Sequence, residues 1–104
     1  MKRLVVQRRA MRDLEAARAY YQVEAPHMVG ELAKEVDAEF LHLQRNPGTG
    51  SPRYGLLVGL PGLRSWSLTQ FPYLIFYFDR DQQIVIARVL HQARDIPNHL
   101  SVAD

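Results

Sequence analysis

Hydrophobic residues recur with a helical period in the first half of the chain. Between Ala10 and Glu24, small and apolar positions are spaced by three or four residues, with charged residues between them. This pattern predicts an amphipathic helix that begins at Arg9 or Ala10. Pro26 disfavours helical geometry at the residue before it and suits the first turn of a new helix. We therefore expect the first helix to end near Glu24 and a second helix to follow after a tight break.

The second helix carries a strong amphipathic pattern. Its apolar stripe has the spacing of one helix face and consists of Val29, Leu32, Ala33, Val36, Phe40 and Leu43. Glu31, Glu35 and Glu39 repeat every four residues on another side of this helix. We interpret the three glutamates as a solvated face, with an acidic docking surface as the alternative. Proline and glycine residues in the run 46–52 end the helix.

The pattern is extended outside the two helices. A short strand is predicted at Lys2 to Gln7, and four more are predicted at 56–58, 63–68, 73–78 and 83–91. Alternation along the last strand places Arg88 on the same face as Ile84 and Ile86. The tail after Pro97 is expected to pack as a turn or to fray.

This order of elements predicts an α+β fold in which a helical hairpin covers one face of an antiparallel sheet. A chain of 104 residues with 47% apolar content can bury one modest core. Residues 1–104 are therefore expected to form a single domain.

The amino-acid composition limits which metal sites the chain can contain and which cellular compartment it suits. The chain has no cysteine, which argues against thiolate zinc sites and fits a reducing cytoplasm. Its four histidines lack the spacing of metal ligands, and no run is long enough for a signal peptide or a membrane span. The net charge is only +2, yet eleven of the thirteen basic residues are arginine. Arginine enrichment suits a charged interface, and codon bias in a GC-rich genome explains it equally well.

Several short motifs follow one another along nearly the whole chain. They are Asp13-Leu14, Tyr20-Tyr21, Ala25-Pro26, Pro47 with Arg53, Pro61-Gly62-Leu63-Arg64, Phe71-Pro72-Tyr73 with Ile75 and Tyr77, and Arg88-Val89-Leu90-His91 with Arg94-Asp95. In this order and spacing, the set resembles the RelE/ParE superfamily of bacterial toxins, and its ParE branch most closely.

The resemblance implies the toxin of a type II toxin-antitoxin system. ParE-like members are known as inhibitors of DNA gyrase that block replication and arrest growth. The expected partner is a ParD-like antitoxin, in a heterotetramer or a larger assembly that contacts DNA only through the antitoxin. No cofactor, metal or membrane is implied.

The RelE branch offers an alternative, because its members are ribosome-dependent mRNA endoribonucleases. RNA cleavage needs a general base, a general acid and cations for the developing charge. The segment 51–78 contains no Asp, Glu or Lys, so the usual base on the central strands is missing. The remaining candidates are Arg64, Arg88, His91 and Arg94, which would be catalytic in a nuclease and would contact the target in a gyrase inhibitor. A third reading is an inactive module that only binds an antitoxin.

Antitoxin binding is expected in the groove between the helical hairpin and the sheet. A tail that folds on binding would bury apolar area and bring acidic groups to the arginines. The residues expected to contact it are Leu14, Tyr21, Arg53 and Arg64. For Arg88, the sequence leaves open whether it pairs internally, with an acidic helix residue or with Asp95, or is held for an antitoxin carboxylate.

Overall fold

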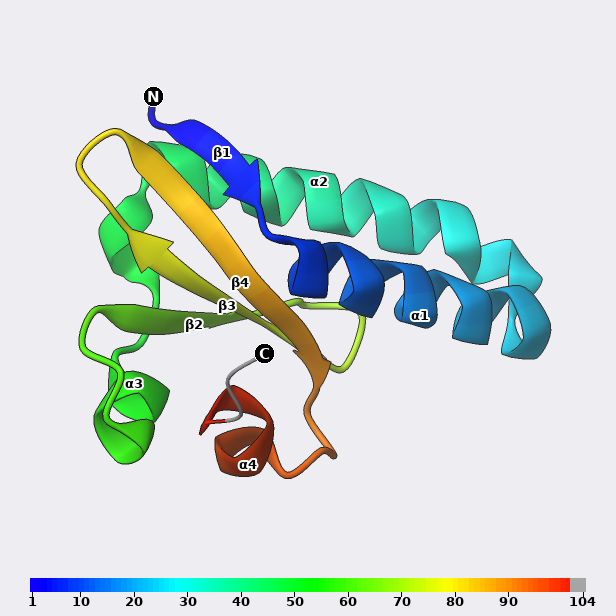
Figure 1. Ribbon diagram of the computed structural model, residues 1–104. Helices are drawn as coiled ribbons and strands as arrows, with labels where there is room; N and C mark the ends of the chain where they lie inside the picture. Colours follow the sequence, from blue (N-terminus) through cyan, green and yellow to red (C-terminus); the bar gives the residue numbers. More distant parts are fainter. Residues whose placement is uncertain (102–104) are drawn as a thin grey trace.

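The computed structural model describes residues 1–101 of the chain (Figure 1). Its strands and α-helices follow in the order β1 (Arg3–Val6), α1 (Arg8–Glu24), α2 (Val29–Arg45), α3 (Arg53–Val58), β2 (Leu63–Ser67), β3 (Tyr73–Asp79), β4 (Gln83–His91) and α4 (Ile96–Ser101). Short 3-10 turns at Pro26–Met28 and Pro47–Thr49 introduce α2 and follow it. The predicted α+β class, with a helical hairpin packed on a sheet, is confirmed. No helix within residues 1–101 is both long enough and apolar enough to cross a membrane.

The four strands form one mixed sheet with the order β1-β4-β3-β2. The last three strands are an antiparallel meander, as predicted, whereas β1 pairs with β4 in parallel, Val5 opposite Val85. The predicted antiparallel sheet is therefore mixed at this edge, where the sequence analysis had not specified how the first strand pairs. Parallel neighbours need a long crossover, and the whole chain between β1 and β4 supplies one.

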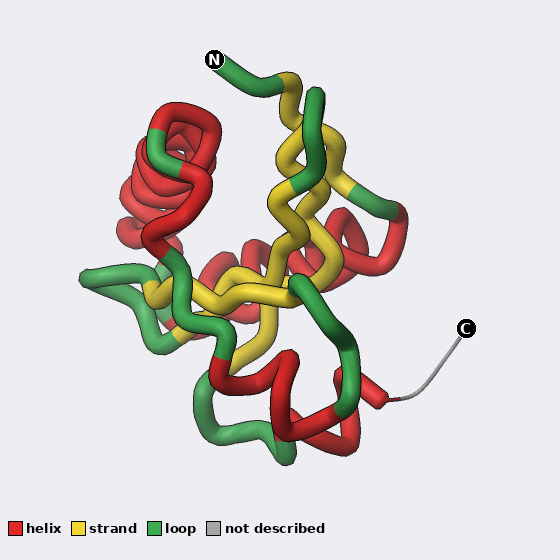
Figure 2. Tube along the Cα trace, turned by 90° about the vertical axis from the view of Figure 1, so that its left-hand side faces the viewer, coloured by secondary structure: helices red, strands yellow, loops and turns green. Residues whose placement is uncertain are grey.

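Helices cover both faces of the sheet. On one face, α1 and α2 pack their buried residues Ala17, Val36 and Leu43 against a core that includes Ile75 and Ile86. On the opposite face, α4 packs against a second and smaller core. Figure 2 shows the short helices α3 and α4 at the bottom, with the strands between them and the long helices.

Residues 53–58 form a helix where a strand was predicted. A short apolar run does not distinguish a strand from a buried helical turn. Pro52 lies at the N-cap of α3, and Gly59 ends the helix in the left-handed conformation with φ 69°. Gly55 packs so tightly that a Cβ there would lie 2.7 Å from the Leu63 carbonyl oxygen. Backbone packing and the two caps therefore decide the helical form.

Residues 96–101 are also helical, where a turn or a frayed tail was predicted after Pro97, and the last three residues of that tail lie outside the described part of the chain. In α4, Ile96 and Leu100 are buried against Leu63, Phe76 and Leu90 on the sheet. Their i, i+4 spacing places both side chains on one face of the helix. This contact seals the face of the sheet that the long helices leave open.

Strand β4 contains an extra residue that interrupts its alternation. Ile86 lies opposite Tyr77 and Arg88 lies opposite the preceding Phe76, so Ala87 has no partner on β3. This arrangement is a β-bulge, which shifts the following side chains to the other face. Val89 therefore joins Ile86 in the core under the long helices. The predicted alternation, which placed Arg88 on the Ile84–Ile86 face, was wrong from the bulge onward.

Of the three glutamates of α2, Glu31 is exposed as predicted, whereas Glu35 and Glu39 form hydrogen bonds within the fold. Glu35 is 8% exposed, and its carboxylate accepts hydrogen bonds from the Thr69 hydroxyl (2.6 Å), the Gln70 N–H (2.9 Å) and the Thr69 N–H. Glu39 accepts a 2.9 Å hydrogen bond from Trp66 Nε1. The prediction was therefore wrong for these two glutamates. The turn between β2 and β3 brings the Thr69 and Gln70 donors to Glu35, and β2 brings Trp66 to Glu39.

Candidate functional site

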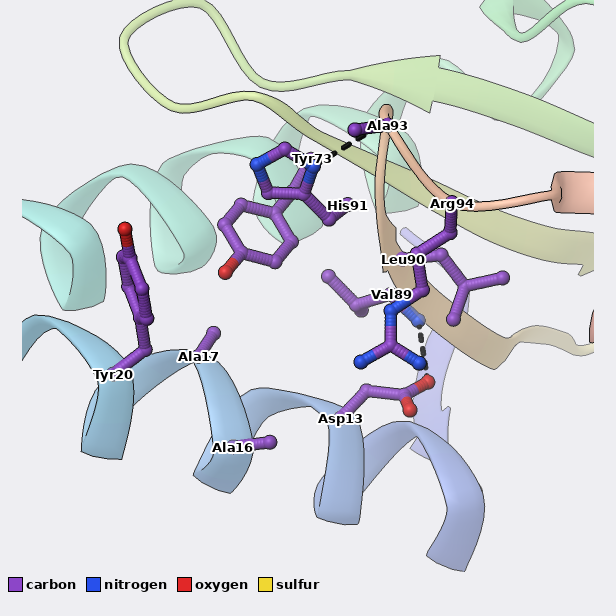
Figure 3. A pocket seen from close by; sticks show the side chains of 10 residues that line it. All are labelled: Asp13, Ala16, Ala17, Tyr20, Tyr73, Val89, Leu90, His91, Ala93 and Arg94. Carbon is purple, nitrogen blue, oxygen red and sulfur yellow. Dashed lines mark hydrogen bonds between the residues drawn. The ribbon is translucent and has the colours of Figure 1, made fainter.

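A pocket of about 340 Å³ lies between α1 and the C-terminal end of β4. Helix α1 and the segment 89–94 provide its walls, with one residue from β3 (Figure 3). The residues that line it are Asp13, Ala16, Ala17, Tyr20, Tyr73, Val89, Leu90, His91, Ala93 and Arg94. We call it the α1–β4 pocket. It exists because β1 pairs with β4 only as far as Ile86, so the last part of β4 faces α1 instead of a strand.

Asp13 joins α1 to the exposed edge of β4. Its carboxylate accepts hydrogen bonds from Arg88 Nε (2.8 Å) and Nη2 (3.0 Å), and from the Val89 N–H (2.9 Å). The side chains of Asp13 and Arg88 are 14% and 12% exposed. Arg88 Nη1 also donates to the His99 carbonyl oxygen of α4 at 3.3 Å. Of the roles left open for Arg88, the structure thus shows internal pairing with an acidic helix residue.

His91 lies at the mouth of the pocket, at the end of β4. Its Nδ1 accepts a 3.0 Å hydrogen bond from the Ala93 N–H, and its ring packs edge-on against Tyr73 at 5.2 Å between centroids. Burial raises the pKa of the Tyr73 hydroxyl, and its neighbours Tyr21 and Tyr20 add to the effect. Tyr73 therefore stays neutral at physiological pH and can donate or accept a hydrogen bond.

Arg94 reaches into the pocket from the loop after β4. Its Nη1 donates to His99 Nε2 at 3.3 Å, while His99 Nδ1 donates to the Asp95 carbonyl oxygen at 2.9 Å. The two bonds form together when Nδ1 carries a proton and Nε2 acts as the acceptor. Within residues 1–101, no carboxylate lies within ion-pair distance of the Arg94 guanidinium.

Arg64 lies outside the pocket, on β2. Its Nη1 donates to the Gly50 carbonyl oxygen at 2.6 Å. Its neighbour across the sheet, Tyr77, accepts from the Gly50 N–H (2.9 Å) and donates to the Pro47 carbonyl oxygen (2.7 Å). Arg64 and Tyr77 thus hold the turn that follows α2. Tyr77 is four residues from Tyr73 along β3, or about 13 Å at the rise of a strand.

The predicted target-contact residues therefore do not form one cluster. His91 and Arg94 line the α1–β4 pocket, and Arg88 lies behind its wall in contact with Asp13. Arg64 holds a turn at the other end of the sheet.

The residues expected to contact an antitoxin are also spread over the surface. Leu14 lines an apolar groove of about 200 Å³ between α1 and α2. Tyr21 is half-buried and packs edge-on against Phe71, with 5.2 Å between ring centroids. Arg53 is exposed on α3, on the other face of the sheet, with its guanidinium 5.4 Å from the Tyr54 ring centroid.

Sequence reasoning did not assign three residues of the pocket. Asp13, Tyr20 and Tyr73 were noted as parts of motifs and were given no role. The available signal was the position of Asp13, one helical turn before Ala17 on the buried face of the first helix. Among residues 1–101, no group of three His, Asp or Glu side chains could hold a metal ion.

Comparisons with known proteins agree with this fold. Residues 4–96 match the family described as the ParE toxin of the type II toxin-antitoxin system, parDE. A solved structure, the chromosomal ParDE toxin-antitoxin system from P. aeruginosa, has a similar fold, with a TM-score of 0.71 and 24% sequence identity. That match covers 88% of this chain and 96% of the other chain. No curated protein matches the sequence.

Proposed function

The chain belongs to the ParE toxin family of type II toxin-antitoxin systems, and we propose that it binds DNA gyrase, blocks replication and is neutralised by a ParD-like antitoxin. The observation that carries this proposal is the extent of the family match. Residues 4–96 include both long helices and the whole meander, so the match extends over the helical hairpin and the sheet. Gyrase works on the chromosome, so this function places the protein in the cytoplasm.

Protein binding accounts for the arginines better than catalysis does. Arg64 and Arg88 each donate to groups within the chain, which leaves one arginine and His91 lining the α1–β4 pocket. Among the described residues, the acidic side chain that lines this pocket is Asp13. Its carboxylate accepts three hydrogen bonds and is therefore not available as a base. We propose that His91 and Arg94 contact the target directly, while Arg88 and Arg64 hold the surface in shape.

A ribonuclease activity is the second candidate, and one observation favours it. His91, Arg94, Tyr20 and Tyr73 line the same pocket, so a titratable base, a cation and two phenols lie close together. Such a set can transfer protons and stabilise charge on a phosphodiester. In that case His91 would be the base and Arg94 the charge stabiliser.

Two assays run side by side test the proposal. Purified antitoxin-free protein is added to gyrase, with supercoiling and cleaved plasmid as readouts, and to translating ribosomes, with mRNA cleavage as the readout. Cleaved plasmid with intact mRNA is expected, and Arg94→Ala should weaken the effect while Arg80→Ala, at the other end of β4, should not. Cleaved mRNA with unaffected gyrase would establish the ribonuclease. No effect in either assay would leave the function of an antitoxin-binding module.

For the partner, the proposal is a ParD-like antitoxin in a heterotetramer or a larger assembly, with DNA contacted through the antitoxin. Leu14 and Tyr21 would contribute apolar area, and Arg53 and Arg64 would meet acidic side chains. Co-expression with the neighbouring gene, followed by light scattering of the purified complex, measures the stoichiometry. A monomeric toxin that does not co-purify with that gene product would refute the proposed assembly.

A further inference from the structure

We propose that the α1–β4 pocket is the place where the toxin receives a carboxylate side chain of its antitoxin, with Arg94 as the residue that binds it. This inference rests on the proposed function, because it assumes an antitoxin that binds the protein. It assigns one pocket, one cation and one class of side chain to that interaction.

The charges that line the pocket are unbalanced, because Asp13 is paired within the fold and the Arg94 guanidinium is not paired with a carboxylate of the described residues. Asp13 is already saturated by Arg88 and by the Val89 N–H, so its charge is compensated inside the fold. The Arg94 guanidinium has five N–H donors, and its one hydrogen bond among the described residues goes from Nη1 to His99 Nε2. A carboxylate in the pocket would give this guanidinium the two-pronged partner that its geometry suits.

The walls of the pocket favour an amino-acid side chain over a free anion. Ala16 and Tyr20 are exposed on α1, one turn apart, and form an apolar wall opposite Arg94 (Figure 3). Tyr20 is 56% exposed, so its ring offers apolar surface that a partner can cover. An acidic residue with an apolar neighbour would pair with the guanidinium and cover the tyrosine ring. An acidic, amphipathic segment that orders on binding has this chemistry.

The pocket also gives neutralisation a direct mechanism. His91 and Arg94 are the proposed target contacts, and both line the pocket that the antitoxin would fill. An antitoxin bound there would cover these residues and would not need to change the fold of the toxin.

Binding of the antitoxin encoded by the neighbouring gene tests the inference, with calorimetry on wild-type protein and three variants. Arg94→Glu reverses the charge in the pocket, and Ala16→Trp fills the pocket without changing its charge. Arg80→Glu is the matched control, because it makes the same charge change at the other end of β4. We expect Arg94→Glu and Ala16→Trp to weaken binding by roughly 30-fold or more, which is about 2 kcal/mol at 1.4 kcal/mol per tenfold change, and Arg80→Glu by less than about 3-fold.

A charge-reversal scan of the antitoxin then locates the partner. Each Asp and Glu of its toxin-binding segment is changed to Arg and tested against Arg94→Glu, and one of these variants should restore most of the lost affinity. Circular dichroism confirms that each toxin variant is folded, and Ala16→Trp supplies an independent result if Arg94→Glu does not fold.

The outcomes separate the two levels of the argument. If no product of the neighbouring gene binds the wild-type protein, the proposed antitoxin-neutralised function fails. If the antitoxin binds tightly and both pocket variants bind as well as Arg80→Glu, the pocket inference is overturned while the proposed function stands. If the pocket variants lose gyrase binding and keep full antitoxin affinity, the occupant is the target, and the inference is again overturned.

Discussion

The contact between Asp13 and Arg88 should be among the most important polar contacts for stability. It joins α1 to β4 across 75 residues of sequence, and both side chains are nearly buried, at 14% and 12% exposed. Removing one partner of a buried ion pair is strongly destabilising, by about 3–5 kcal/mol. The substitution Asp13→Ala removes this contact.

The structure indicates two losses in Asp13→Ala. The Arg88 guanidinium loses both bonds to the carboxylate, and the N–H of Val89, a residue that is 3% exposed, loses its acceptor. An unsatisfied buried donor alone costs about 1–3 kcal/mol. The expected loss is therefore at least about 3 kcal/mol, out of a total of roughly 5–15 kcal/mol for a domain of ordinary stability. Asp13→Asn should cost less, because its amide oxygen can still accept the Val89 N–H.

Urea unfolding monitored by circular dichroism measures this loss, with Glu15→Ala as the control. Glu15 is an exposed acid on the same helix, so its removal should change stability by no more than about 0.5 kcal/mol. In a thermal scan, Asp13→Ala should unfold at least about 12 °C lower than wild type. The double variant Asp13→Ala/Arg88→Met should lose less than the sum of the two single variants, by more than about 1 kcal/mol, because it removes both charges.

Two results would refute this reasoning. If Asp13→Ala were as stable as Glu15→Ala within about 1 kcal/mol, the pair would not hold α1 to the sheet. If the two single substitutions were additive, the two side chains would not be coupled.

Three further substitutions test other parts of the fold. Gly50→Ala should lower the free energy of unfolding in urea by about 1–3 kcal/mol, because the new Cβ would lie 2.5 Å from the Tyr77 hydroxyl. In the control Gly48→Ala, the new Cβ meets nothing within 4 Å, and stability should hardly change. Equal stability losses in the two variants would contradict the close approach at Gly50. Burial acts to raise the pKa of Glu35, but the hydrogen bonds to its carboxylate outweigh burial and lower the pKa below the ordinary value of 4.5. The ionised carboxylate therefore stabilises the fold above pH 4.5, and this stabilisation is lost as the pH falls through the lowered pKa. Glu35→Gln should therefore be less stable than wild type at neutral pH, and the difference in stability should shrink as the pH falls below 4.5. A difference that stays constant with pH would exclude this linkage. Ile96→Ala should cost about 2 kcal/mol or more and increase binding of a hydrophobic dye, and unchanged stability would mean that α4 does not seal the sheet.

Periodicity was sufficient to predict the elements that repeat over several turns or a full strand. The two long helices begin and end within a few residues of the predicted positions, because Pro26 and the 46–52 run mark their ends clearly. Short elements were predicted less well. The apolar run at 56–58 had no period of its own, and its helical form depends on Gly55 and Gly59, whose roles follow from packing and from a left-handed turn.

The candidate site was predicted only in part. The sequence analysis singled out His91 and Arg94 at the end of the last strand, and the structure places both in the lining of the pocket. It could not place Arg88, because one extra residue in β4 changes which face each later side chain occupies. It could not place Arg64 either, because the contact of Arg64 with the Gly50 carbonyl oxygen forms only when the turn after α2 packs against β2. A bulge of this kind leaves little trace in hydrophobic alternation.

The sequence by itself determined the class of the fold, the limits of the long helices, the meander and the resemblance to ParE toxins, because each of these depends on local spacing or on the order of motifs. Tertiary structure alone decided which charged side chains meet their partners. Asp13 and Arg88 are 75 residues apart, and Glu35 and the Thr69 N–H are 34 apart. The physical reason is that such contacts depend on how the sheet is twisted, bulged and covered, and these features arise only when the whole chain packs.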